Sequence, residues 1–167
     1  MYWIIYLLLA YLFLVFFLTR MVIPHLGFTR TRLPDDLPRS MSSAISRLKR
    51  QSRSKRDFVE RVYELLSSKY FGSDIDTFID FNMLFIKDIK EIWRVEGYLP
   101  CTLQNYLMRI FLVRSGLFKE DDIRLRVTFI ILNIHQYLQA RIDGEWVDVD
   151  VWGAYRGVKV GKHVWGY

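Results

Sequence analysis

A single cysteine, Cys101, is present among the 167 residues. The chain therefore has no disulfide framework, and one unpaired thiol is compatible with a reducing compartment. Its histidines and carboxylates do not follow the spacing of metal ligands, and the sequence contains neither a glycine-rich phosphate loop nor an internal repeat. We therefore predict no metal and no cofactor.

Acidic residues are absent from positions 40–56, where six lysines and arginines lie, so that much of the net charge of +6 belongs to this part of the chain. Near anionic headgroups each basic residue contributes on the order of 1 kcal/mol to binding. We predict that the basic stretch 39–56 contacts anionic lipid headgroups. Binding to nucleic acid is not expected, because the nearby aromatic residues are too few to form a stacking surface.

Charged side chains are also absent from residues 1–18, and Arg20 alone interrupts the apolar run up to Ile23. Eighteen helical residues span about 27 Å, close to the thickness of the hydrocarbon core of a bilayer. No basic segment precedes the run and no small-residue cleavage site follows it, which disfavours a cleaved signal peptide. The sequence predicts a transmembrane anchor over residues 1–23, embedded in the lipid bilayer.

The basic residues that follow this anchor indicate its orientation. The positive-inside rule places them, and the rest of the chain, in the cytoplasm. An anchor with almost no N-terminal tail can, however, be inserted either way. We predict a single-pass membrane protein with a cytoplasmic domain.

Three prolines between the apolar run and the first helical pattern indicate a linker over residues 24–41. The remaining residues, 42–167, suffice for one domain with a helical part at 42–96 and a core at 97–167. Two helices are expected in the helical part, one from Ser54 to Tyr70 and one that Ser73 caps. The second carries an apolar stripe formed by Phe78, Phe81, Leu84, Phe85, Ile89 and Ile92.

Residues 127–142 are rich in β-branched and aromatic side chains, and Asp143-Gly144 is a strong turn signal before the strand pattern resumes at 145–152. If Ile142 pairs with Glu145, side-chain alternation gives the hairpin one apolar face that should be buried. This face carries Leu132, Ile134, Leu138, Ala140, Ile142, Val147, Val149 and Val151. A loop is expected after the hairpin, at 152–157, and a further strand at 158–164.

The opposite face of the hairpin carries His135, opposite Trp152, and Asp150 as its diagonal neighbour. Diagonal pairs lie about 7–8 Å apart between backbones, within reach of an imidazole and a carboxylate, whereas Asp148 is one pair farther away. A carboxylate that fixes the imidazole tautomer produces the base that a thiol nucleophile needs. A histidine in a sheet is more often structural, and His163 is a competitor without a carboxylate in its own segment. His25, at the membrane boundary, is not expected to act.

Cys101 lies where a helix should begin. Pro100 cannot extend a helix backwards, the next residues have apolar side chains at helical spacing, and Ser115-Gly116 supplies a stop. At a helix N-terminus, unpaired amides and the helix dipole stabilise a thiolate, and the same amides can bind an oxyanion. The competing interpretation is a buried, inert thiol.

Three segments together resemble the core of transglutaminase-like cysteine enzymes: 97–101 (GYLPC), 133–137 (NIHQY) and 145–150 (EWVDVD). In that family a cysteine starts a helix that packs on an antiparallel sheet, a histidine lies on one strand and an aspartate lies on the next. The resemblance covers roughly residues 93–167. The chain departs from the family's pattern after the histidine, at Gln136 and Tyr137, and after the aspartate.

The resemblance implies an α+β fold with a papain-like, transglutaminase-like core, preceded by helices and by the N-terminal transmembrane helix. It also implies a catalytic triad of Cys101, His135 and Asp150 that attacks a carboxamide or peptide carbonyl through a thioester. Hydrolysis of a peptide or protein substrate is preferred, because water needs no second binding site and microbial relatives are regarded as peptidases. Transamidation that crosslinks proteins and an inactive, membrane-tethered binding module of the same fold remain open.

Overall fold

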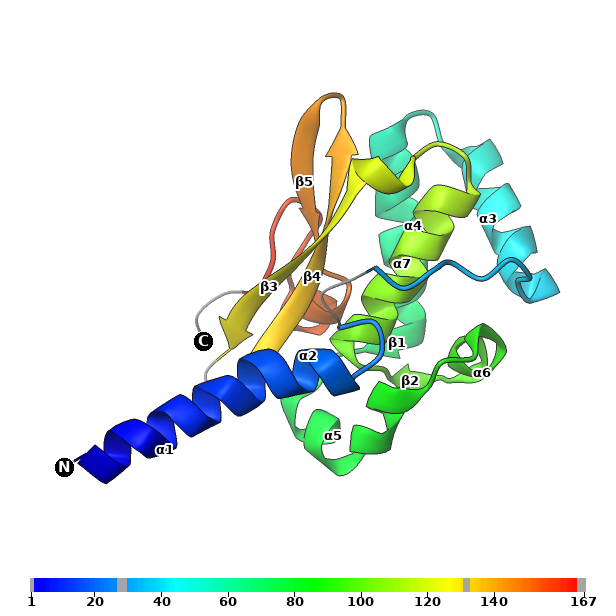
Figure 1. Cartoon of the computed structure of the whole chain (residues 1–167). Coiled ribbons are helices and arrows are strands. Elements are labelled where there is room, and N and C mark those ends of the chain that lie inside the picture. Colours follow the sequence, from blue (N-terminus) through cyan, green and yellow to red (C-terminus); the bar gives the residue numbers. More distant parts are fainter. Residues whose placement is uncertain (1, 27–29, 131–132, 165–167) are drawn as a thin grey trace.

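The computed structural model describes residues 2–26, 30–130 and 133–164 (Figure 1). The helices in the described part are α1 (Tyr2–Phe13), α2 (Thr19–Val22), α3 (Arg39–Gln51), α4 (Lys55–Lys69), α5 (Asp74–Ile79), α6 (Ile89–Arg94) and α7 (Cys101–Arg114). A π-helical segment, Leu14–Leu18, joins α1 to α2, and short 3-10 helices lie at Phe81–Phe85, Glu120–Asp122 and Trp152–Arg156. The strands are β1 (Tyr70–Phe71), β2 (Gly97–Tyr98), β3 (Ile123–Ile130), β4 (Asn133–Ile142) and β5 (Glu145–Val149).

The main sheet is antiparallel with the strand order β3-β4-β5, and the two-residue strands β1 and β2 pair in parallel elsewhere. The β4–β5 hairpin has the predicted register, since Ile142 pairs with Glu145 and Leu138 pairs with Val149. Asp143 and Gly144 form its turn with positive φ angles of 52° and 90°, as a two-residue turn of type I′ requires. The apolar face is mostly buried as expected; Val147 is half-buried, and Leu132 lies outside the described residues.

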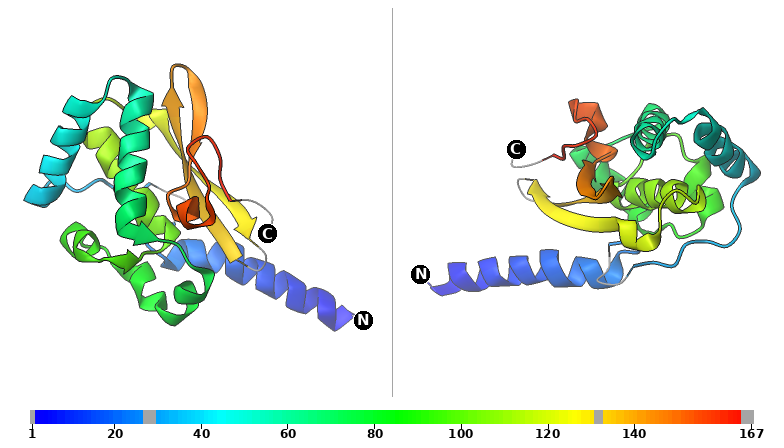
Figure 2. Two further views of the ribbon diagram at one scale, coloured as in Figure 1. Left: turned by 180° about the vertical axis from the view of Figure 1, so that it is seen from behind. Right: turned by 90° about the horizontal axis from the view of Figure 1, so that it is seen from above.

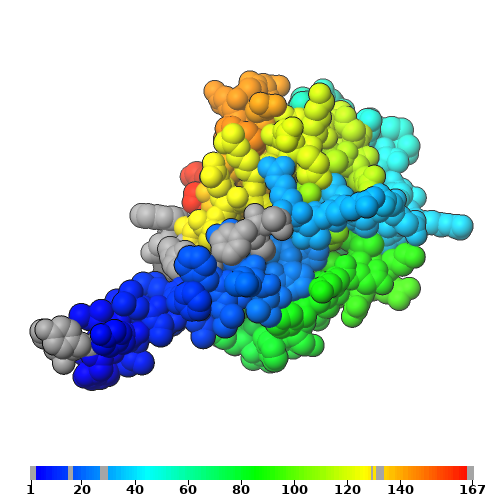
Figure 3. Space-filling model, in the orientation of Figure 1, coloured from blue at the N-terminus to red at the C-terminus, as the bar shows by residue number. Residues whose placement is uncertain are grey.

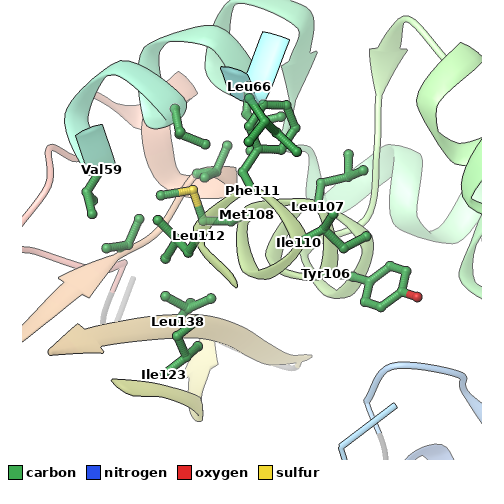
Figure 4. Close-up of a cluster of buried hydrophobic side chains, with 14 of the residues drawn as sticks. Val59, Leu66, Tyr106, Leu107, Met108, Ile110, Phe111, Leu112, Ile123 and Leu138 are labelled. Carbon is green, nitrogen blue, oxygen red and sulfur yellow. The ribbon is translucent and has the colours of Figure 1, made fainter. Parts of the chain in front are cut away.

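The molecule is built in layers, with the sheet on one side, α7 against it, and α4 and α3 beyond α7 (Figures 1 and 2). The core fills the space between the sheet and the helices (Figure 4). In it, Phe111 from α7 lies beside Leu66 from α4, whereas Leu138 from β4 lies on the other side of α7 (Figure 4); all three have no measurable exposure to solvent. Because α7 is covered on both sides, residues 102–112 are all buried, and only its two ends, including Cys101, are more exposed.

The predicted transmembrane helix over residues 1–23 is wrong. The apolar run forms the twelve-residue α1, the five-residue π-helical segment and the four-residue α2. Among the described residues, no helix is both long enough and apolar enough to cross a membrane. The predicted single-pass localisation is therefore wrong as well, and the cytoplasmic orientation derived from it is not supported. The prediction compared the length of the whole apolar run with the thickness of a membrane. In the structure, the backbone divides that run into shorter elements.

The end of the apolar run packs on the domain. His25 and Leu26 are buried, the His25 ring lies 4.0 Å from the Tyr106 ring of α7 between centroids, and the His25 carbonyl accepts a hydrogen bond from the Gln136 side chain at 3.2 Å. By contrast, the side chains of Trp3–Phe13 are exposed, and α1 projects from the body of the molecule (Figure 3). Residues 19–26 thus belong structurally to the domain.

The predicted linker, 24–41, follows the same surface. The Arg109 side chain donates to the Thr31 carbonyl at 2.7 Å, and the Tyr106 hydroxyl lies 3.4 Å from the Arg32 carbonyl. α3 then begins at Arg39, and four apolar residues on its inner face, Met41, Ala44, Ile45 and Leu48, are buried. The basic residues of 39–51 therefore lie on a helix that is packed onto the domain along one side, and Lys55 and Arg56 begin α4.

Two other sequence expectations differ from the structure. The helix that Ser73 caps ends at Ile79, and 3-10 and α6 segments replace its continuation, so that Phe78 and Phe81 are 71% and 60% exposed and form no buried stripe. Residues 158–164 form turns instead of a strand, and Gly161 adopts a φ of 97° that interrupts an extended chain.

Candidate active site

Cys101 is the first residue of α7, and Pro100 precedes it in an extended conformation. The Pro100 carbonyl accepts hydrogen bonds from the amides of Leu103 and Gln104, each at 3.0 Å. The Gln104 side chain reaches back and donates to the Leu99 carbonyl at 2.7 Å, which fixes the entry to the helix. The first two amides of an α-helix have no acceptor within it. A half-buried, free thiol therefore lies beside unpaired helix amides.

His135 lies on β4, where it pairs with Thr128 of β3, and only 2% of it is exposed. Its Nε2 atom lies 2.8 Å from Oδ2 of Asp150, which is fully buried. The other ring nitrogen, Nδ1, is therefore the one that can exchange a proton with the Cys101 thiol. The two residues that the hairpin register placed together are therefore in direct contact.

Asp150 is held from three directions. Besides His135, its Oδ2 accepts a hydrogen bond from the Val164 amide at 2.9 Å, and its Oδ1 accepts one from the Gly153 amide at 3.0 Å. A Cβ atom on Gly153 would lie 2.9 Å from Asp150 Oδ2 and 2.7 Å from Val164 Cγ2, so this close approach requires glycine. Three N–H groups therefore surround the buried carboxylate.

The electrostatics of the site couple the histidine to both partners. Burial of the His135 ring lowers its pKa, but the hydrogen bond to Asp150 and the interactions with the Cys101 thiol outweigh this effect and raise the pKa to about 10. A protonated His135 is thus favoured in the neutral range. Its positive charge then lies beside the Cys101 thiol.

A cavity of about 70 Å³ opens beside these groups, and Cys101, His135 and Trp152 line it. Thr19, Ile23 and Leu26 from the N-terminal segment form part of its wall. The apolar run at the N-terminus therefore contributes to the site itself, which its composition did not indicate.

Trp152 is a further residue of the site. Its ring lies 4.8 Å from the His135 ring between centroids, as their predicted opposition across the hairpin allows. The indole Nε1 is buried and has no hydrogen-bond partner within the described part of the chain.

Asp148 serves the other candidate histidine. Its Oδ2 lies 2.6 Å from His163 Nδ1, and its Oδ1 accepts a hydrogen bond from Gln139 at 2.7 Å. The Tyr137 ring stacks on His163 with centroids 4.1 Å apart. His163 therefore has a carboxylate partner, supplied by another segment, but it is not among the residues that line the cavity with Cys101.

Metal-binding clusters of three or more His, Cys, Asp or Glu residues were not found in the part of the chain that the structure describes. Comparisons of the chain with models of protein families, with curated proteins and with solved structures gave no match. The resemblance to transglutaminase-like enzymes therefore remains a prediction from the three sequence segments.

Proposed function

We propose that this protein is a cysteine acyl-transfer enzyme of the transglutaminase-like type that hydrolyses a peptide bond or carboxamide through a thioester on Cys101. One observation carries the proposal. A buried His135 bonded to Asp150 at 2.8 Å lines the same cavity as a thiol at a helix N-terminus. This arrangement supports roles for Cys101 as nucleophile, His135 as base and Asp150 as orienting carboxylate.

In the first half of the reaction, the Cys101 thiolate attacks the substrate carbonyl carbon and forms a carbon–sulfur bond. The protonated His135 gives its proton to the leaving nitrogen, the carbon–nitrogen bond breaks, and ammonia or an amine departs. The amides at the start of α7, where Cys101 lies, would supply the donors for the developing oxyanion.

In the second half, His135, now neutral, takes a proton from water as the water oxygen adds to the thioester carbonyl. The carbon–sulfur bond then breaks, which releases a carboxylic acid and restores the thiolate beside the protonated imidazole. Asp150 keeps the His135 ring in one orientation through both steps. An amine in place of water would give transamidation by the same route.

A peptide library offered to the purified full chain tests this proposal. Mass spectrometry distinguishes new peptide termini, converted carboxamides and, with added methylamine, methylamide products. We expect products with the wild-type chain and none with Cys101→Ala, while Asp148→Asn serves as a matched control that keeps the nucleophile. The proposal would be contradicted if Cys101→Ala formed products as fast as the wild-type chain, or if the wild-type chain formed no products.

A further inference from the structure

The cavity beside Cys101 has a chemical character that the proposed reaction leaves open. Six residues from four parts of the chain form its apolar wall: Ile23, Leu26, Leu84, Pro100, Ile130 and Ile134. We call this wall and the space that it encloses the acyl pocket. The acyl pocket adjoins the Cys101 thiol, so the substrate group that fills the pocket is attached close to the reacting carbonyl.

Charged groups are scarce in the acyl pocket. No lysine or arginine is among its lining residues, and the carboxylate of Asp74 is engaged by Arg156. The Thr77 hydroxyl is also occupied, since it accepts from Tyr98 at 2.8 Å and donates to the Ser73 carbonyl at 2.7 Å. Apart from His135 at the reacting end and the hydroxyl of Thr102, a charged substrate group would find few partners here to replace its hydration, whereas an aliphatic group would gain from burial.

The size of the acyl pocket limits the group further. At about 70 Å³ it has roughly half the volume of an engineered cavity of ~150 Å³ that binds benzene. An aromatic ring or a long chain is therefore too large, while roughly three or four carbon atoms fit.

We propose that the acyl pocket selects substrates whose acyl side carries a short, branched aliphatic group next to the scissile carbonyl. The inference rests on the proposed thioester chemistry and names the acyl class that enters it. The carbonyl lies at Cys101 and the branched group extends between the N-terminal segment and the start of β4. A side chain of the valine or leucine type, or a free isovaleryl group, has the required shape.

The p-nitrophenyl esters of acetate, isovalerate, octanoate and benzoate test this inference with the full chain. Each fitting carbon should raise kcat/KM roughly fourfold, so isovalerate, with three more carbons, should exceed acetate by up to about 60-fold, and octanoate and benzoate should fall below isovalerate. Release of nitrophenolate gives the rates, and intact-protein mass spectrometry gives the acyl group on Cys101. Cys101→Ala supplies the background.

Variants at Leu84, a half-buried position on a short 3-10 helix, change the size of the acyl pocket in opposite directions. Leu84→Phe should lower the ratio of isovalerate to acetate rates at least threefold, and Leu84→Ala should raise the relative rates of octanoate and benzoate. Leu117→Ala, at a partly buried position against the core but outside the pocket, should leave the ratios unchanged. Circular dichroism checks that each variant is folded.

The two proposals fail differently. If no ester acylates Cys101, the thioester chemistry is wrong and the acyl pocket loses its purpose. If Cys101 is acylated but acetate or benzoate reacts as fast as isovalerate, or both Leu84 variants keep the wild-type ratios, the enzyme proposal stands and the acyl-pocket inference is overturned.

Discussion

Replacing His135 by alanine should change how fast Cys101 is alkylated and how that rate depends on pH. An ordinary thiol with a pKa of about 8.5 is only about 1% ionised at pH 6.5. In the folded protein, the raised pKa of about 10 keeps His135 protonated in this range, so that a positive charge lies beside Cys101. This charge should give a gain in the rate at which Cys101 is alkylated.

Nucleophilicity partly offsets that gain. A thiolate stabilised by a neighbouring charge is less basic, and each unit of basicity costs about threefold in reactivity. We therefore expect the wild-type chain to react with iodoacetamide at pH 6.5 roughly tenfold faster than His135→Ala. The wild-type rate should also change little between pH 6 and 8, whereas the variant's rate should rise about tenfold per pH unit, as for a free thiol.

The assay is quenched alkylation followed by mass spectrometry, which needs no knowledge of the substrate. The unfolded wild-type chain supplies the reference for a thiol without partners, and His163→Ala controls for the loss of an imidazole elsewhere. If the wild-type and His135→Ala chains show the same rates and the same pH dependence, His135 does not act on Cys101, and the triad is refuted.

Three further changes probe the support of the site. Asp150→Asn should reduce turnover by 10²-fold or more, because it removes the carboxylate that holds His135, whereas Asp148→Asn should cost less than tenfold; the opposite order in a rate assay would show that Asp148 is the partner. Gly153→Ala should lower the midpoint of thermal unfolding by several degrees and slow alkylation, since its Cβ would meet the carboxylate at 2.9 Å; unchanged calorimetry would refute the close packing. Deletion of residues 1–26 should remove one wall of the cavity and lower turnover; full activity in the shortened chain would show that this segment is dispensable.

Local signals predicted the elements that carry the proposed catalytic residues. Pro100 and Gly116 are visible in the sequence as the start and stop of α7, and Gly116 has the positive φ of 74° that a helix stop favours. The turn at Asp143-Gly144 fixed the hairpin register, and that register was sufficient to place His135 near Asp150. In each case, a few neighbouring residues determine the geometry.

Contacts between distant segments could not be predicted in this way. The partner of His163 is Asp148, fifteen residues earlier, and no residue pattern in the C-terminal segment predicts this contact. Residues 158–164 alternate like a strand, but the amide of Val164 bonds to a side chain rather than to a neighbouring strand. The apolar run before Pro24 has the composition of a membrane helix. Composition alone does not show where the backbone changes its helical form, nor that Leu26, just after the run, is buried against the domain.

The hydrogen bond from the Val164 amide to Asp150 has a consequence for the order of events during synthesis. Cys101 and His135, the proposed nucleophile and base, emerge from the ribosome first, and the carboxylate of Asp150 receives its last N–H donor only after a further fourteen residues have been added. A nascent chain that stops short of Val164 therefore holds all three side chains with the carboxylate incompletely fixed. The arrangement would delay full reactivity of the Cys101 thiol until the segment after Asp150 has folded back and Val164 has reached the carboxylate.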